Sequence, residues 1–106
     1  MAWTVFVKQA ALDHLHGFGK KTGRLLLQKA LKILEAAPLA ETRNLKTLRP
    51  NPVAQRELRI LGKYRFLFSV EEEVETVTII LVGEKRGNQL LVAGQEFSEH
   101  ESSSPE

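Results

Sequence analysis

Positively charged side chains crowd a predicted hairpin and the end of the strand that follows it. Three apolar, strand-like runs lie between Gln55 and Val92, and cations interrupt these runs where they end. A guanidinium group contacts two phosphate oxygens at once and stays charged at neutral pH, so arginines placed in this way favour an anionic ligand. The sequence therefore predicts a basic site on a sheet, built from Arg56, Arg59, Lys63, Arg65, Lys85 and Arg86.

The net charge of +2 hides a strong asymmetry along the chain. Residues 1–70 hold 13 Lys and Arg against 4 Asp and Glu, whereas residues 71–106 hold 2 against 9. A body this basic is typical of proteins that bind nucleic acid. Lys46 and Arg49 are candidates to steer RNA by their charge. Tyr64 is a candidate to stack on a base, although a hairpin tyrosine is also typical of packing against helices.

Several function classes are excluded by what the sequence lacks. The chain contains no cysteine, which excludes disulfides, thiolate metal ligands and a cysteine nucleophile. His14 and His16 are two residues apart on a predicted helix and do not share a face, so we expect no metal site and no cofactor. No run approaches the ~20 apolar residues of a membrane-spanning helix, and we expect a cytoplasmic protein with no membrane partner.

One domain and a tail are predicted from length and composition. A chain of 106 residues has room for a single core, which we assign to residues 1–97. Residues 98–106, SEHESSSPE, combine low hydrophobicity with acidic and serine residues. Such a segment buries too little surface to offset its ordering entropy, so we expect a disordered acidic tail.

The apolar period predicts one strand, two helices and then a series of strands. Trp3, Val5 and Val7 alternate with polar residues, as in a half-buried strand. Helices are expected at residues 9–15 and about 24–37, with the glycine-bounded loop GFGKKTG between them and Pro38 after the second. Residues 40–52 read as a loop whose Leu45 and Leu48 are buried under the sheet.

The strands that follow are expected at residues 53–61, 64–70 and 74–82, and the first two are joined by a hairpin across Gly62 and Lys63. The third is nearly continuous in apolar residues, which is typical of a central strand covered on both faces. A last short strand near Leu90 is expected at an edge. This order predicts an α+β fold, in which an antiparallel two-helix hairpin packs on one face of a twisted, mainly antiparallel sheet. Arg59, Arg65 and Lys85 would then meet on the open face if the register allows it.

The order of elements and three motifs resemble the RelE/ParE superfamily of bacterial type II toxin–antitoxin toxins. The motifs are NLKTLRPN after the helices, ELRILGKYRFLFSV across the hairpin, and VTIILVGEKRG in the next strand. The resemblance covers residues 3–97 and implies a four-stranded sheet and a cognate antitoxin as partner. In the RelE branch it further implies an mRNA interferase, a metal-independent endoribonuclease that cuts mRNA on the ribosome through the 2′-hydroxyl.

The resemblance also implies catalytic roles for four cations. Arg65 matches the arginine that holds the scissile phosphate in RelE-like toxins, Lys85 or Arg86 matches a cation after the next strand, and Arg59 matches a basic strand residue. The remaining candidates are then RNA-binding residues, namely Arg56, Lys63, Tyr64, Lys46 and Arg49. The chain departs from the RelE pattern at Gln55 and Glu57, where the family has lysines, and at Leu91, where it has tyrosine or histidine.

Cleavage through the 2′-hydroxyl needs a base, cations that stabilise the phosphorane, and an acid for the leaving oxygen. Glu57 or Glu84 could act as the base, and Lys85 as the acid, if they lie close to the site. Three functions therefore stay open. The chain is an mRNA interferase, or a ParE-like toxin that inhibits DNA gyrase without nuclease chemistry, or a catalytically impaired relative that retains antitoxin binding.

Overall fold

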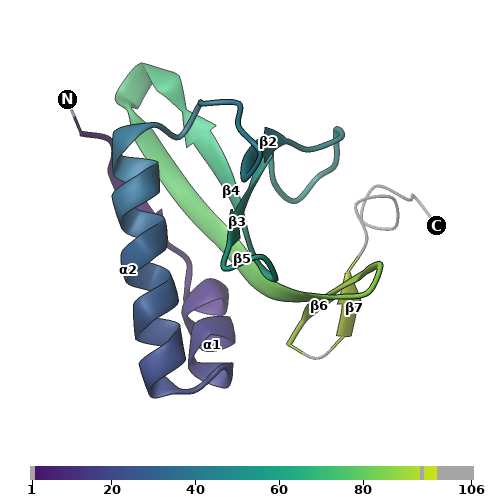
Figure 1. Cartoon of the computed structure of the whole chain (residues 1–106). Coiled ribbons are helices and arrows are strands. Elements are labelled where there is room, and N and C mark those ends of the chain that lie inside the picture. The colour runs from purple at the N-terminus through teal and green to yellow at the C-terminus, as the bar shows by residue number, and fades with distance from the viewer. Residues whose placement is uncertain (1, 94, 98–106) are drawn as a thin grey trace.

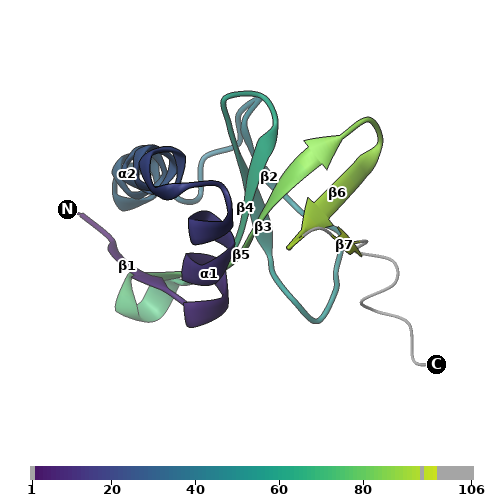
Figure 2. The ribbon, with the colours of Figure 1, turned by 90° about the horizontal axis from the view of Figure 1, so that it is seen from below.

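The computed structural model describes residues 2–93 and 95–97, so the predicted tail at residues 98–106 lies outside the described residues. Two helices cover one face of a twisted sheet (Figures 1 and 2), and no described helix lies on the other face. This confirms the predicted α+β fold with its N-terminal strand and two-helix hairpin. The elements are β1 (Thr4–Val7), α1 (Gln9–Gly17), α2 (Lys20–Ala36), β2 (Leu45–Thr47), β3 (Arg56–Ile60), β4 (Tyr64–Glu71), a 3-10 turn (Glu72–Val74), β5 (Thr76–Arg86), β6 (Gln89–Val92) and β7 (Gln95–Phe97).

The sheet has seven strands within the described residues rather than the four that were expected. Its order is β2-β3-β4-β5-β6-β7 with antiparallel neighbours, and β1 pairs with β5 in parallel. Strand β6 is the last short strand expected near Leu90. Strands β2 and β7 were not expected, because each is only three residues long and its sequence carries too little periodicity to be recognised. Because β6 pairs with both β5 and β7, the free edge predicted near Leu90 does not exist.

Strand β5 organises the sheet. It pairs with β4 on one side, and on the other side with β1 along residues 76–79 and with β6 along residues 84–86. It runs on to Arg86, past the expected end at residue 82, because the β6 hairpin pairs with the segment EKR. The pairing steps from Leu67↔Leu81 to Phe68↔Ile79, which leaves Ile80 as a β-bulge. Side chains normally alternate between the two faces along a strand, and the bulge shifts this alternation by one residue. The bulge therefore determines which face each residue from Leu81 to Arg86 occupies.

The main core lies between the helices and the sheet. It contains Leu26, Ala30 and Leu34 of α2, Phe66 and Phe68 of β4, and Val77, Ile79 and Val82 of β5, all essentially inaccessible to solvent. A smaller cluster lies on the other face, where the loop after β2 brings Leu48 and Ala54 onto Leu67. The prediction that Leu45 and Leu48 are buried is confirmed, but the two belong to different clusters.

Helix α2 begins at Lys20, four residues before the predicted start, because it continues through Gly23. A Cβ atom on Gly23 would lie 2.4 Å from the carbonyl oxygen of Leu15 in α1. Glycine therefore permits a close approach of the two helices that any other residue would prevent. No helix in the described part of the chain is long and apolar enough to cross a membrane.

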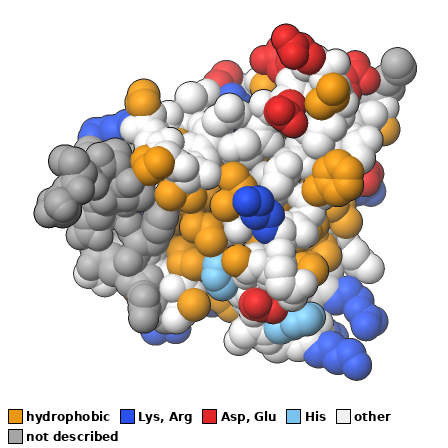
Figure 3. All heavy atoms as spheres, turned by 180° about the vertical axis from the view of Figure 1, so that it is seen from behind, with side chains coloured by type: hydrophobic (Ala, Val, Ile, Leu, Met, Phe, Trp, Pro, Cys, Tyr) orange, Lys and Arg blue, Asp and Glu red, His pale blue; other side chains and the backbone are white. Residues whose placement is uncertain are grey.

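Helix α1 closes the gap that β1 and β6 leave along the same side of β5. The Lys8 N–H donates to the carbonyl of Ile79 at 2.9 Å, and the Val82 N–H donates to Nδ1 of His14 at 3.3 Å. Figure 3 shows the face behind Figure 1, where histidine side chains lie beside a central area of hydrophobic side chains. Burial lowers the pKa of His14, and the neighbouring Asp13 opposes this shift in part. A neutral imidazole is what the bond requires, since Nδ1 accepts a hydrogen bond only when it carries no proton.

The close approach at Gly23 makes a prediction about stability. Gly23→Ala should lower the free energy of unfolding by about 2 kcal/mol, because the methyl group would push α1 and α2 apart. Gly17→Ala is the matched control, since nothing lies within 4 Å of the place that its methyl group would take at the end of α1. Urea unfolding of the two variants checks this, and equal stabilities would contradict it.

The bond from Val82 to His14 predicts a dependence of stability on pH. Because the pKa of His14 is lower in the folded protein, its contribution is present above the unfolded value of about 6.5 and is lost as the pH falls through and below it. The difference in unfolding free energy between the wild type and His14→Ala should therefore shrink between about pH 7.5 and about pH 5, since these values bracket the titration of imidazole. A difference that does not change with pH would contradict the role of His14.

Candidate functional site

Arg59 and Arg65 are brought together by the β3–β4 hairpin. They are register partners on adjacent strands, so their side chains lie on the same face of the sheet. The turn between them is tight, with positive φ angles at Leu61 (54°) and Gly62 (80°). This turn directs the carbonyl of Gly62 towards Arg65, whose Nη1 donates to it at 2.9 Å. The hairpin thus fixes both the position and the orientation of the Arg65 guanidinium.

Glu57 joins the two arginines. Its Oε2 lies 3.0 Å from Nε of Arg65 and 3.7 Å from Nε of Arg59. The side chains of Arg65 and Glu57 are 6% and 11% exposed, whereas that of Arg59 is 34% exposed. Glu57 and Arg59 are two residues apart on β3, so they share the face that carries no described helix. One carboxylate therefore lies between two guanidinium groups, with Arg59 on the side towards solvent.

Burial is the main influence on the pKa of Arg65 in this group. Desolvation lowers the pKa of Arg65, and the neighbouring Arg59 lowers it further, while Glu57 acts in the opposite direction. A guanidinium in this environment still carries its proton at neutral pH. Two arginines and one glutamate leave an excess of one positive charge, which suits an anionic ligand.

Two lysines add to the positive charge of this face. Lys46 of β2 is the register partner of Glu57, so it extends from the same face and not from a loop beneath the helices, as the sequence had suggested. Lys85 lies two residues beyond Gly83, the partner of Arg65, and therefore shares that face as well. Neither lysine forms an ion pair with another of the residues that the structure describes.

Gly83 allows β6 to pack closely beside Arg65. A Cβ atom there would lie 2.7 Å from the carbonyl oxygen of Leu91 and 2.9 Å from the side chain of Val92. Leu90 pairs with Lys85 and packs against the small cluster around Leu67. The cations are therefore bounded on one side by apolar side chains of β6.

Arg86 lies on the opposite face of the sheet from Lys85. Its neighbour Glu84 pairs with Tyr64, whose ring contacts Phe18 at the end of α1 with 5.0 Å between ring centroids. Glu84 binds Lys63 at 3.3 Å and Arg86 at 3.7 Å, and Lys63 also lies 5.2 Å from the centroid of the Tyr64 ring. Arg86, Lys63 and Tyr64 thus form a separate group on the helix side, and Tyr64 packs against the helices as a hairpin tyrosine typically does.

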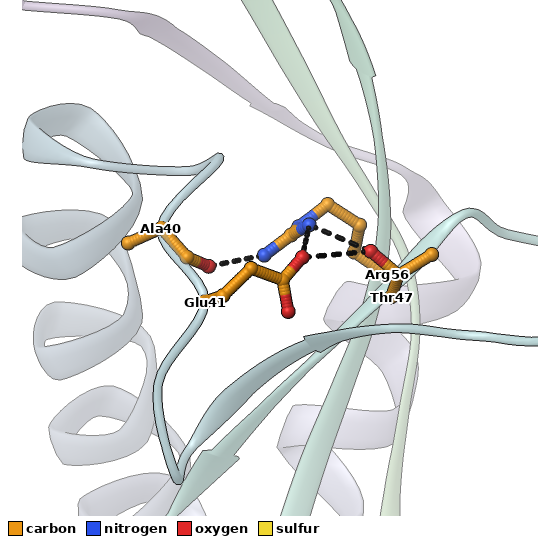
Figure 4. A network of polar contacts seen from close by, with 4 residues as sticks. All are labelled: Ala40, Glu41, Thr47 and Arg56. Carbon is orange, nitrogen blue, oxygen red and sulfur yellow. Dashed lines mark hydrogen bonds and ion pairs between the residues drawn. The ribbon is translucent and has the colours of Figure 1, made fainter.

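Arg56 also faces the helices, and its guanidinium is buried (Figure 4). It donates to Glu41 at 2.8 Å, to Thr47 at 2.9 Å and to the carbonyl of Ala40. These bonds tie the segment after α2 to β2 and β3. Arg56 thus lies on the opposite face of the sheet from Arg59 and Arg65, and its guanidinium has partners within the fold, which argues against the RNA-binding role expected from the sequence. Arg49 lies on the loop after β2 and is exposed.

A cleft of about 580 Å³ lies on the helix side, between α1 and the β5–β6 hairpin. Leu91 lines it together with His14, Phe18, Glu84 and Arg86. Leu91 therefore does not face Arg65.

Comparison with solved structures identifies the architecture. The chain is similar to a chain of the toxin–antitoxin complex RelBE2 from Mycobacterium tuberculosis, with 27% identity and a TM-score of 0.67, over 80% of this chain and 100% of that one. It is also similar to the isolated RelE toxin of E. coli (23% identity, TM-score 0.60, 80% and 86% covered) and to the RelE–RelB complex of Pyrococcus horikoshii (24%, 0.62, 82% and 98%). No protein-family model matches the sequence, and no curated protein matches it either.

The chain has a RelE-like fold. The resemblance inferred from the order of elements and the three motifs is thereby confirmed. In this chain the two arginines of the hairpin lie on the face without a described helix. Gln55 accepts a hydrogen bond from the Val70 N–H at 2.8 Å and so serves the backbone, while Glu57 neutralises part of the charge of Arg59 and Arg65.

The role of Glu57 as a counter-ion was missed in the sequence, although a signal was present. Residues 57 and 59 of a strand share a face, so the segment RELR places an acid beside Arg59. Only the register shows that Arg65 lies opposite Arg59 and completes the group. The candidate site therefore consists of Lys46, Glu57, Arg59, Arg65 and Lys85.

The geometry predicts strong coupling between Glu57 and Arg65. Glu57→Ala should lower the unfolding free energy by about 2–3 kcal/mol, because it leaves two neighbouring cations, one of them nearly buried, without their anion. Adding Arg65→Met to that variant should recover part of the loss. Glu84→Ala is the control, because its ion pairs involve exposed cations and should cost no more than about 1 kcal/mol. Losses that simply add in the double variant, measured by urea unfolding, would contradict the coupling.

Proposed function

We propose that this RelE-like chain is the toxin of a type II toxin–antitoxin pair and that it acts on mRNA at the ribosome. The observation that carries the proposal is the group of four cations, Lys46, Arg59, Arg65 and Lys85, on the sheet face of a RelE fold. The similar chain from M. tuberculosis belongs to a toxin–antitoxin complex, which supports an antitoxin as the partner here. The site of action would then be the cytoplasm.

The chemistry of RNA cleavage fits part of this group. Attack of the 2′-hydroxyl on the adjacent phosphorus builds negative charge on the phosphorane oxygens, and preorganised guanidinium groups stabilise that charge. Arg65 is preorganised by the carbonyl of Gly62, and Arg59 lies beside it. Lys85 is the candidate to protonate the leaving 5′-oxygen, since an ammonium donates a proton where a guanidinium does not. These steps require no metal ion.

A second candidate function follows from the same site. Glu57 already forms ion pairs with two guanidinium groups, which makes it a poor base for the 2′-hydroxyl, and Leu91 lies on the opposite face. A toxin that binds its target without cleaving RNA would tolerate both features. Inhibition of DNA gyrase, as in the ParE branch, is therefore the alternative, and a catalytically impaired relative that still binds antitoxin is the third possibility.

Induced expression in a bacterial host separates the three functions. The mRNA interferase predicts growth arrest with new 5′ ends inside coding sequences, and Arg65→Glu should relieve both effects. Lys32→Glu on the exposed side of α2 is the charge-matched control and should remain toxic. Arrest with intact transcripts and inhibited supercoiling by purified gyrase would favour the second function. The absence of any arrest, with the protein shown to be folded, would contradict a toxin.

A further inference from the structure

We propose that Glu57 is an internal counter-anion that occupies the phosphate-binding position of Arg59 and Arg65 in the free protein and gives way to an RNA phosphate on binding. This inference rests on the proposed function, because it names the regulation of that same site. It differs from a role of Glu57 as a general base, in which the carboxylate would act on RNA that is already bound.

Glu57 lies between Arg59 and Arg65, where a phosphate oxygen could bind. A single oxygen, Oε2 of Glu57, meets Nε of Arg65 at 3.0 Å and Nε of Arg59 at 3.7 Å. Carboxylates and phosphates present the same kind of oxygen acceptors to a guanidinium fork, and they compete for it. The position between the two arginines that would suit a phosphate oxygen is therefore filled by a side chain of the protein itself.

The burial of Arg65 means that an anion must lie beside it at all times. Arg65 is 5% exposed, and a nearly buried cation without an anion is unfavourable by several kcal/mol in general. An anion must then accompany Arg65 both before and after RNA binds. Binding at this site is an exchange of one anion for another, not the addition of an anion to a free cation.

The surroundings make such an exchange feasible. Arg65 also donates to the carbonyl of Gly62 at 2.9 Å, so its guanidinium can keep its place while Glu57 turns away. Lys46 is the register partner of Glu57 on β2, is exposed, and has no ion pair among the described residues. Opposed side chains on adjacent antiparallel strands lie within reach of one another, so Lys46 can receive the displaced carboxylate. Arg59, at 34% exposure of its side chain, is the arginine that solvent and an incoming phosphate meet first.

The effect of removing the internal anion can be measured as RNA affinity. Glu57→Gln keeps the shape of the side chain and one acceptor oxygen for Arg65 but removes the charge. A short single-stranded RNA should bind this variant about tenfold more tightly than the wild type, because the phosphate no longer competes with a carboxylate. Glu84→Gln is the matched control, since it makes the same change in net charge on the opposite face and should tighten binding only about twofold. Fluorescence anisotropy at a fixed, low salt concentration gives both ratios.

The outcomes separate this inference from the proposed function. If the wild type binds RNA and Glu57→Gln binds no more tightly than Glu84→Gln, the inference is overturned and the proposed function stands. If cleavage falls in Glu57→Gln while RNA affinity stays the same, Glu57 is a base and the inference is again overturned. If neither the wild type nor Glu57→Gln binds RNA, both proposals fail.

A measurement on the wild type covers the case in which Glu57→Gln does not fold. The Nε–H resonance of Arg65 in an NMR spectrum reports on its ion pair with Glu57, whose Oε2 lies 3.0 Å from that nitrogen. Titration with the same RNA should shift this resonance as a phosphate replaces the carboxylate, while Nε–H of Arg56, which faces the helices, should not move. RNA binding that leaves the Arg65 resonance unchanged would overturn the inference.

Discussion

The buried charge of Arg65 is the constraint on which the candidate site depends. Its guanidinium is enclosed by the hairpin and by β3, so it needs a hydrogen-bond acceptor and an anion inside the fold. The tight turn supplies the acceptor at Gly62, and β3 supplies the anion at Glu57. Each of these requires the pairing of Arg59 with Arg65, because a shift by one residue would turn Glu57 to the helix side. The register of β3 and β4 is thus fixed by polar contacts on one face as well as by the apolar core on the other.

The sheet divides the predicted basic region into two electrostatic groups. On the face without a described helix, Glu57 accompanies Arg59 and Arg65, and on the helix side Glu84 accompanies Lys63 and Arg86. The acidic turn at residues 71–75 is far from both groups, since β4 separates it from the hairpin. A high density of cations along the sequence therefore does not amount to one basic patch. Within the described residues, only the group around Arg65 combines a fixed orientation and partial burial with lysines that form no ion pair.

The sequence predicted the helices, the order of the long strands and the hairpin, because their apolar periods are long enough to be distinct. It could not predict the bulge at Ile80, which reverses the faces of β5 and arises from the pairing with β4. Lys85 and Arg86 illustrate the consequence for the site. The sequence offered Lys85 or Arg86 as the match for one cation, because the strand was expected to end at residue 82. The strand in fact includes both residues, and consecutive residues of a strand point to opposite faces. Lys46 was assigned to a loop for the related reason that β2 is only three residues long.

The two faces of the sheet also explain how a RelE-like fold can hold an altered site. Residues such as Phe66, Phe68 and Val82 fill the space under the helices, where a change of volume is costly, so the architecture constrains them closely. The side chains around Arg65 on the other face contribute less to the core and can change without loss of the fold. Glu57 keeps the burial of Arg65 favourable by providing an anion within the chain. A likeness of 27% identity therefore transfers the scaffold, while the roles of the side chains around Arg65 must be established for this chain itself.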